Sequence, residues 1–363
     1  MDLLRKRTGF RGPIQIDEKR LLIVKLRYIG DTMSIIPVID NLRQNSPGAE
    51  IDVMVNKGTE EVLVHHPGIR RVWAYDRRAA KNSSLRSLVY HLRLIRALRA
   101  MHYHVVIDFT HGDRASFLCF ITGSPYRISY LNSSNLTKVL MNRFISAEAS
   151  KMHIVDYQLE ALKLFGMNHF NRKIDLHIPD PVKQKVDRVL GGQSTQQVGT
   201  KAAIHPGARG RLRQWPPERF AEIGRRLHSE YGADILLVGG PSEAGLVESV
   251  EQHLGFPALF KSTDLSLLEM ASLFSRCRIF VGNDSAPAHL AAAAGCPTLT
   301  LFGPTFPRMW RPLTDRGEVV FKNVECCGCR QEECIRPERT CMEMIEIGEV
   351  WGKVQRMLSA GNS

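Results

Sequence analysis

The chain has 363 residues, 44% of them hydrophobic, which is enough for a packed core and long enough for two domains. Lysine and arginine outnumber aspartate and glutamate by 49 to 37, a net charge of +12 that suits an anionic partner, although a basic enzyme without one would show the same excess. The sequence contains no zinc-finger, RNP-type or glycine-rich RNA-binding motif, which argues against nucleic acid.

Residues 1–20 are basic and contain no apolar core of a signal peptide. No apolar run reaches the roughly 18 residues that a membrane span needs. We therefore expect the protein to be made and kept in the cytoplasm.

In the first half of the chain, short apolar runs alternate with stretches of helical character. The runs 20–26, 50–55, 71–76, 104–109 and 126–130 predict strands, and the stretches 33–45, 84–101 and 113–122 predict helices. Continuous apolar runs between polar turns are typical of strands buried on both faces of a parallel sheet.

The second half repeats this alternation, with strands predicted at 202–207, 233–240, 278–284 and 298–304 and helices near 217–230, 242–253, 265–276, 285–295 and 344–358. Such alternation in both halves predicts two doubly wound α/β domains. The segment 177–201, which contains Pro, Gly, Ser and Gln, is the expected boundary. We expect domains at 1–180 and 181–345, and a C-terminal helix in 346–363 that crosses back to the first domain.

Ligands of open α/β sheets bind beyond the carboxyl ends of the strands, and one such end carries the segment GNDSAPAHL (282–290). Asp284 and Ser285 form a turn before a small-residue helix whose free N–H groups and positive dipole end would bind phosphate. His289 follows one turn later on the same face. The alternative interpretation is an ordinary helix capped by Asp284 or Ser285.

A basic loop follows another predicted strand. Arg209, Arg211 and Arg213 lie in HPGARGRLRQW (205–215), and guanidinium groups bind phosphate with two hydrogen bonds and keep their charge. A diphosphate leaving group is one natural ligand, and a solvated basic loop is the alternative.

Two further strand ends carry single candidates. In LLVGGPSEAG (236–245), Gly240 permits close approach of the backbone to a ligand, and Glu243 is placed to bind the hydroxyl groups of a ribose, unless it only stabilises the first turn of a helix. In LLIVKLRYIGDTM (21–33), Gly30 and Asp31 follow the first strand, and Asp31 is a candidate general base or, alternatively, a helix N-cap.

The eight cysteines fall into two groups. Cys119, Cys277 and Cys296 lie in apolar segments, as expected of buried thiols. The others crowd into CCGCRQEECIRPERTC, where four thiolates would suffice for a structural metal site, namely Cys326, Cys329, Cys334 and Cys341. Their spacing is not that of a standard zinc ribbon, and reduced thiols on a loop are the favoured interpretation.

These segments together resemble glycosyltransferase family 9, the ADP-heptose:lipopolysaccharide heptosyltransferases. The opening VKLRYIGDTMSIIPVIDNLRQNSPGAEIDVMV, the segment HIVDYQLEALKLFG, the run GNDSAPAHLAAAAGCPTLTLFGPT and the cysteine-bearing tail CGCRQEECIRPERTCM are all similar to segments of that family. The form KLRYIGD resembles its heptosyltransferase III branch.

The resemblance implies a GT-B architecture, in which two Rossmann-like domains face each other across a cleft, and an inverting transfer without metal or cofactor. The sequence contains no Asp-x-Asp metal clamp. The resemblance implies that Asp31 deprotonates a hydroxyl of the lipopolysaccharide inner core, which then attacks the heptose of an ADP-heptose donor. Arg213 and the helix N-terminus at Asp284, Ser285 and Ala286 would stabilise the departing ADP.

The resemblance also implies that Glu243 meets the ribose and that Leu265 packs on the adenine, and His289 matches a histidine of the family. Two positions depart from the family pattern. Arg213 stands where lysine is common, so that Arg209 or Arg211 could share its role, and Ala286-Pro287 stands where glycine is usual.

On the acceptor side, the segment DFTHGDRASFL (108–118) ends a predicted strand, so we expect the acceptor groove to be lined by Thr110, His111, Asp113 and Arg114. The helix at 84–103 carries four arginines among apolar residues: Arg86, Arg93, Arg96 and Arg99. With the basic N-terminus, this helix would rest on the anionic cytoplasmic face of the inner membrane, or it would simply cover the sheet with a solvated basic stripe.

Other classes of protein remain open. A nucleotide-binding protein without transfer activity would not need Asp31, and a glycosyltransferase for another nucleotide sugar would need the same groups. A nicotinamide dehydrogenase is disfavoured because no G-x-G-x-x-G motif follows any predicted strand.

Overall fold

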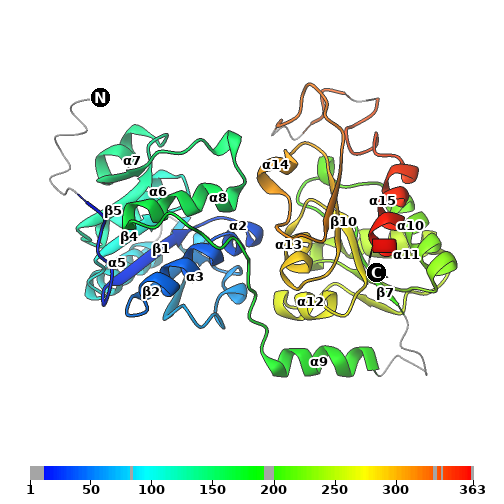
Figure 1. The fold of residues 1–363 in the computed structure, drawn as a ribbon, viewed down its shortest axis with the longest axis horizontal. Coiled ribbons are helices and arrows are strands. Elements are labelled where there is room, and N and C mark those ends of the chain that lie inside the picture. The colour runs from blue at the N-terminus through cyan, green and yellow to red at the C-terminus, as the bar shows by residue number, and fades with distance from the viewer. Residues whose placement is uncertain (1–11, 82–84, 192–199, 330–332, 337, 361–363) are drawn as a thin grey trace. The chain divides into compact units, whose positions relative to one another are not determined.

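The computed structural model describes residues 12–81, 85–191, 200–329, 333–336 and 338–360. These residues form two compact units that divide between His177 and Ile178. Each unit is built on one six-stranded β-sheet with flanking helices (Figure 1). Within the described ranges, no helix combines the length and the apolar character needed to span a bilayer.

The sheet of unit 1 is parallel, with strands in the order β3-β2-β1-β4-β5-β6. The strands are β1 (Arg20–Lys25), β2 (Glu50–Asn56), β3 (Arg71–Tyr75), β4 (Val105–Asp108), β5 (Tyr126–Tyr130) and β6 (Arg143–Ile145). β1 and β4 form the central pair, with Val24 opposite Asp108. The strand order reverses between these two strands, so the switch point of the sheet lies at their carboxyl ends.

The helices of unit 1 are α2 (Ile29–Met33), α3 (Ile36–Asn45), α4 (Arg77–Lys81), α5 (Leu85–Ala100), α6 (Asp113–Ile121), α7 (Asn135–Leu140) and α8 (Ile154–Leu159). Short 3-10 segments lie at η1 (Glu60–Val62), η2 (Ala149–Lys151) and η3 (Glu160–Phe165). Because parallel strands are joined by right-handed crossovers, α3 covers one face of the sheet, and α5, α6 and α7 cover the other. Both faces are therefore closed, which explains why β1 is apolar on both sides.

Unit 2 repeats this plan with strands in the order β12-β11-β10-β7-β8-β9. They are β7 (Lys201–His205), β8 (Asp234–Val238), β9 (Phe260–Ser262), β10 (Ile279–Asn283), β11 (Thr298–Phe302) and β12 (Gly317–Phe321). β7 and β10 form the central pair, with His205 opposite Gly282. Read from the other edge, this is the strand order of unit 1, and the switch point again lies between the first and fourth strands.

The helices of unit 2 are α9 (Asp180–Gly191), α10 (Pro217–Tyr231), α11 (Ala244–Leu254), α12 (Leu267–Phe274), α13 (Ala286–Ala293), α14 (Pro307–Trp310) and α15 (Ile347–Ala360), with 3-10 segments η4 (Arg211–Arg213) and η5 (Pro241–Glu243). α15 belongs to unit 2, where it packs against α10 and β12. Trp215 and Trp351 both lie in the core that these elements share.

The elements differ from the expected ones in several details. The helix predicted near 33–45 is α3 from Ile36 onward, and Met33 ends the preceding helix α2. The units divide at the start of the segment 177–201, which was the expected boundary, and α9 occupies Asp180–Gly191 of it, buries Val186 and Leu190, and contacts α12. Residues 192–199 of that segment lie outside the described residues. The short strands β6, β9 and β12 were not expected, because their apolar runs are brief or mixed with charge.

We expect the Trp351→Ala substitution to destabilise unit 2 by about 3 kcal/mol or more, because it leaves a cavity between α15 and α10. The ring of Trp351 lies 6.0 Å from that of Tyr231 and carries the guanidinium of Arg226 at 5.8 Å. Urea unfolding followed by circular dichroism measures the loss. The exposed Leu136 of α7 provides the control, and its replacement by alanine should change stability by less than about 0.5 kcal/mol. Equal effects of the two substitutions would contradict this packing.

Candidate active site

The candidate residues of unit 1 gather at the carboxyl ends of β1 and β4. Lys25 ends β1, and Asp108 ends β4. The side chain of Thr110 joins the two ends, because its Oγ1 accepts a hydrogen bond of 2.9 Å from the backbone N–H of Leu26. Arg27 Nε donates to the carbonyl oxygen of Thr110 at 2.9 Å and closes the same junction.

Lys25 is a buried charge within an apolar strand. Its side chain is 3% exposed, and its ammonium lies 3.3 Å from Asp31 Oδ1 and donates to the carbonyl oxygen of Phe109 at 3.1 Å. The Gln158 amide, in the orientation that satisfies both of its polar atoms, accepts a third hydrogen bond from Lys25 at 3.1 Å. Three acceptors thus serve the three N–H donors of the ammonium. Burial lowers the pKa of Lys25, and the charge of Asp31 opposes that shift.

Asp31 lies in the first turn of α2, where it is not the helix cap. The N-cap of α2 is Tyr28, whose side chain makes no capping hydrogen bond. Asp31 instead faces Lys25 with one carboxylate oxygen, and its side chain is 16% exposed. The geometry is that of a carboxylate held at one oxygen by a buried cation on a side chain that stays partly exposed.

Asp108 supplies a second carboxyl group at this switch point, but it is fully buried. Its two oxygens accept hydrogen bonds from the N–H of Thr110 at 2.7 Å and from Ser116 Oγ at 2.8 Å. Burial raises the pKa of Asp108 to about 6 in spite of these bonds and of the charge on Lys25. Asp108 therefore organises the end of β4 rather than meeting a ligand.

His111 follows in a strained conformation. Its φ of 59° lies in the left-handed region, which is uncommon for residues that carry a β-carbon. Its ring stacks on Tyr130 at 4.1 Å, and Tyr130 stacks on Tyr157 at 4.1 Å. The residue is exposed, yet desolvation of the ring and the charges of Lys25 and Arg27 lower its pKa to about 4. The imidazole is therefore neutral at pH 7.

The other expected acceptor residues lie at the start of α6. Asp113 accepts hydrogen bonds from Ser134 Oγ and, at 3.3 Å, from Thr137 Oγ1, which ties α6 to α7. Arg114 is exposed. The structure thus brings Thr110 and His111 beside Lys25, whereas it uses the polar groups of Thr110 and Asp113 for internal hydrogen bonds.

In unit 2, Asn283 joins the two strands of the switch point. It is fully buried, donates to the carbonyl oxygen of Pro206 at 2.7 Å, and accepts from the N–H of Trp215 at 3.1 Å. The indole N–H of Trp215 donates to the carbonyl oxygen of Ile345 at 3.0 Å. The basic loop 208–214 is therefore fixed at both ends to the core of the unit.

Glu243 turns back over the end of β7. Its Oε2 lies 3.1 Å from His205 Nε2 and accepts from the N–H of Gly240 at 2.7 Å. Burial works to raise the pKa of Glu243, but the hydrogen bond and charge of His205 outweigh it, so the pKa is lowered. A β-carbon on Gly207 would lie 2.1 Å from the carboxyl carbon of Glu243, so a larger residue there would displace this carboxylate.

The N-terminus of α13 carries Ser285 at the N-cap, and its side chain makes no capping hydrogen bond. Ser285 Oγ instead lies 3.4 Å from His205 Nδ1 and donates to the carbonyl oxygen of Asn283 at 3.2 Å. Asp284 does not cap the helix either, because it accepts a hydrogen bond from Thr305 Oγ1 and lies 3.7 Å from Arg213 Nη1. Burial raises the pKa of Asp284, and Thr305, Arg213 and Arg209 oppose that shift.

The remaining predicted donor residues surround this centre. Arg209 and Arg211 are exposed, and Arg213 is half-buried. His289 is half-buried in α13, beside Ala286 and one turn from Ser285, and Leu265 is half-buried just before α12. Together they place a cationic loop, a helix N-terminus without a side-chain cap and a carboxylate around the carboxyl ends of β7, β8 and β10.

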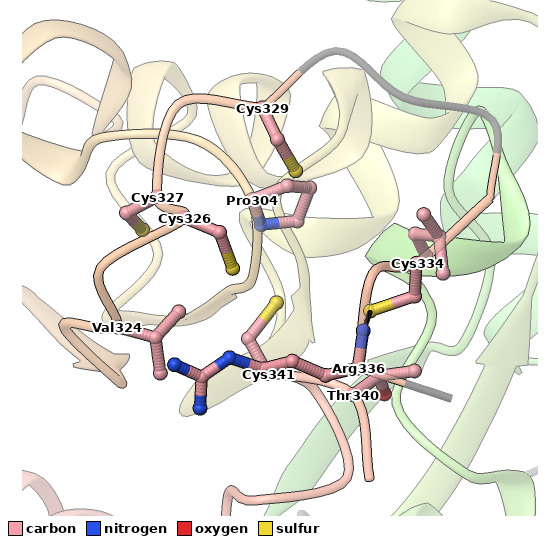
Figure 2. A pocket seen from close by; sticks show the side chains of 10 residues that line it. Pro304, Val324, Cys326, Cys327, Cys329, Cys334, Arg336, Thr340 and Cys341 are labelled. Atoms are coloured by element: carbon pink, nitrogen blue, oxygen red, sulfur yellow. Dashed lines mark hydrogen bonds between the residues drawn. The ribbon is translucent and has the colours of Figure 1, made fainter. Parts of the chain in front are cut away.

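The five clustered cysteines are free and line a cavity of unit 2 together with Pro304, Arg336 and Thr340 (Figure 2). Burial raises the pKa of Cys341 to about 11, and the four other thiols of the cavity reinforce the shift. Across the described residues, no group of three or more His, Cys, Asp or Glu side chains is arranged to hold a metal ion. The structural metal site at Cys326, Cys329, Cys334 and Cys341 was the less favoured interpretation of the sequence and stays an untested alternative.

The sequence analysis missed four polar residues that organise the two switch points: Lys25, Asp108, Gln158 and His205. Two of them left a signal in the sequence. Lys25 is the one charged residue in the run LLIVKL, and His205 ends an apolar strand immediately before Pro-Gly. A charge inside a buried strand requires a partner, and that requirement would have pointed from Lys25 to a nearby carboxylate.

The model of glycosyltransferase family 9 (heptosyltransferase) matches residues 91–339. The chain belongs to this family. Over 297 residues it is 28% identical to lipopolysaccharide heptosyltransferase 3 of Escherichia coli (strain K12), a match that covers 80% of this chain and 84% of the relative. Membership of family 9 identifies the protein as a glycosyltransferase and confirms the family predicted from its sequence motifs.

Two solved structures of this family have the same fold. The glycosyl transferase family 9 protein from Veillonella parvula DSM 2008 superposes with a TM-score of 0.83 at 20% identity, over 96% of this chain and 100% of that one. Escherichia coli heptosyltransferase WaaC with ADP-2-deoxy-2-fluoro heptose gives a TM-score of 0.71 at 21% identity, over 93% and 99%. These matches confirm the predicted fold class, two Rossmann-like doubly wound domains of GT-B architecture.

The buried Asp108 predicts a specific pH dependence of stability. The pKa of this carboxyl group is about 6 in the folded protein and lower in the unfolded chain. Such a group stabilises the native state fully at a pH below the unfolded pKa, and this stabilisation is lost as the pH rises through the folded pKa. Asparagine at this position keeps the shape without the charge. Relative to Asp108→Asn, the wild-type free energy of unfolding should therefore fall by ~2 kcal/mol between pH 4 and pH 7. A difference that does not vary with pH in urea titrations would contradict this.

Proposed function

We propose that this glycosyltransferase transfers heptose from ADP-L-glycero-D-manno-heptose to the inner core of lipopolysaccharide, with inversion and without a metal ion. Unit 1 binds the acceptor, and unit 2 binds the donor. The relatives support the reaction class, because one is a lipopolysaccharide heptosyltransferase 3 and another carries an ADP-heptose analogue. The opening segment KLRYIGD favours the heptosyltransferase III branch.

The single observation that carries the mechanism is the contact between Asp31 and buried Lys25. Lys25 holds one carboxylate oxygen of Asp31 at the switch point of unit 1, and the side chain of Asp31 stays partly exposed. In the proposed reaction, Asp31 accepts the proton of an acceptor hydroxyl. The hydroxyl oxygen bonds to the anomeric carbon of the heptose as the bond from that carbon to the diphosphate breaks. ADP departs with the bonding electrons from the opposite face, which inverts the configuration.

Unit 2 supplies groups that suit the departing diphosphate. The first turn of α13 has no side-chain cap and offers the backbone N–H of Ala286, since Pro287 has no N–H and that of Ala288 donates to Ser285, and Arg213 lies beside it through Asp284. Groups that are already in place when negative charge develops are effective catalysts, because they need no reorganisation. Glu243, ionised through its contact with His205, is proposed to bind the ribose, and Leu265 is proposed to pack on the adenine.

The acceptor surface is proposed to begin at His111. Its neutral imidazole stacks on two tyrosines beside Lys25, and strained residues that are held by such packing often have a functional role. Arg114 is exposed at the start of α6, where it is placed to meet an anionic substituent of the core. The lipid part of lipopolysaccharide would keep the enzyme at the cytoplasmic face of the inner membrane.

A donor panel tests the proposed activity. The purified protein is incubated with ADP-heptose, UDP-glucose or GDP-mannose and with lipopolysaccharides truncated at successive core sugars, and products are weighed by mass spectrometry. We expect turnover with ADP-heptose on one truncated acceptor only, with a gain of one heptose unit. Turnover with another nucleotide sugar alone would reassign the donor, and binding of ADP without any transfer would indicate a nucleotide-binding protein.

We expect Asp31→Asn to lower kcat by about a thousandfold, because asparagine keeps the size of the side chain but cannot take the proton. The affinity for ADP, measured by calorimetry, should change by less than about twofold, because Asp31 lies in the other unit. Asp175→Asn, which alters an exposed carboxylate of unit 1 paired with Lys173, is the matched control and should leave kcat unchanged. Retained activity in Asp31→Asn would refute Asp31 as the base.

A further inference from the structure

The outer side of one helical layer of unit 1 is unusually apolar. α5, α6 and α7 cover one face of the sheet, and α6 contacts both of the other two (Figure 1). Fourteen large hydrophobic residues are exposed in the described chain, and eight of them belong to these three helices. We call the exposed side of these helices the α5–α7 face.

The apolar residues form stripes at helical spacing. On α5, Leu85, Leu88 and Leu92 stand three and four residues apart and share one side of the helix, and Leu85 is 77% exposed. A core-packed helix would turn such a stripe towards the sheet, yet α5 buries only Ser87 and Leu98.

The neighbouring helices continue this surface. On α6, Phe117 and Phe120 are both about half exposed, and on α7, Leu136 and Val139 are also exposed, the latter at 69%. Each pair stands three residues apart, so its members lie on one side of their helix. Large exposed patches of this kind mark interaction surfaces in most proteins.

The charge of the α5–α7 face is almost entirely positive. Its basic residues are Arg86, Arg93, Arg96, Arg99, Arg114 and Lys138, and its one acidic residue is Asp113. Of these, Arg99 donates to the carbonyl oxygen of Ile121 and ties α5 to α6. Within the described chain, Arg86, Arg93 and Arg96 form no ion pairs. A partner of this face must therefore accept apolar side chains and carry negative charge.

The α5–α7 face adjoins the candidate acceptor residues. In a parallel α/β sheet each helix begins at the carboxyl edge of the strands, where Asp31 and His111 lie. The exposed residues Leu85, Leu88 and Leu92 belong to the first half of α5, and α6 begins two residues after His111.

We propose that the α5–α7 face docks on the surface of an anionic lipid bilayer. Exposed leucines and phenylalanines enter the boundary between headgroups and acyl chains, and the arginines around them pair with lipid phosphates. A second copy of the chain fits less well, because it would bring the arginines of two faces together. That this bilayer also carries the acceptor rests on the proposed function, whereas docking itself does not.

Vesicle flotation tests the docking without donor or acceptor. The full chain is mixed with vesicles of phosphatidylcholine alone or with about one-third phosphatidylglycerol. We expect binding to the anionic vesicles, at least tenfold weaker binding to the neutral ones, and weakening as salt rises from about 0.1 M to about 0.5 M. The double variant Leu88→Glu/Leu92→Glu should lose binding at least tenfold, and Arg93→Glu/Arg96→Glu at least as much.

A matched pair of single substitutions separates this face from general surface charge. Val139→Glu on α7 should weaken vesicle binding, whereas Val189→Glu on α9, another exposed valine on a helix, should not. Circular dichroism confirms that each variant is folded.

The proposal is overturned if the wild type does not bind anionic vesicles, or if the α5–α7 variants bind as tightly as the wild type. It is also overturned if light scattering finds a dimer that the Leu88→Glu/Leu92→Glu variant abolishes, since the face would then join two copies. None of these outcomes depends on whether the donor is ADP-heptose.

Discussion

The buried ammonium of Lys25 is the constraint on which the switch point of unit 1 depends. A charge at the end of a central strand is tolerated only when every donor has a partner, and leaving it unpaired costs about 3–5 kcal/mol. Phe109, Gln158 and Asp31 provide those partners, and they come from the loop after β4, from α8 and from α2. Satisfying one lysine therefore fixes the position of three segments and holds the carboxylate of Asp31 at the switch point.

In unit 2, different side chains form the hydrogen bonds at the ends of the central strands. Its central strands also end in polar residues, but there His205 pairs with Glu243, and Asn283 bonds to the backbone of the basic loop. The result is an edge with arginines and a helix N-terminus without a side-chain cap, and one carboxylate is turned inward over Gly207. The same strand order thus ends in a carboxylate paired with a buried lysine in one unit and in a cationic loop beside a helix N-terminus in the other.

Much of this arrangement could be predicted from the sequence, because long apolar runs specify the central strands of a parallel sheet and because glycines and polar residues mark their ends. The short edge strands β6, β9 and β12 could not, since edge strands are only partly buried and their sequences are mixed. The helix α9 was hidden by proline and polar residues around it. Asp31, Glu243 and Ser285 were predicted as site residues from their position after strands, and the structure places them at the ends of the central strands or beside them. Gln158 and Asp108 act through contacts between distant segments, which one sequence does not reveal.

The central claim is that Lys25 acts on the reaction through Asp31, and a double-mutant cycle on transfer kinetics tests it most directly. Lys25→Met keeps the length of the side chain and removes the charge. The account predicts that it lowers kcat by about a hundredfold, with the KM for the donor changed by less than about threefold, because the carboxylate loses its orientation. It also predicts that Lys25→Met/Asp31→Asn is no slower than Asp31→Asn alone. Full activity of Lys25→Met, or two losses that multiply, would contradict the account.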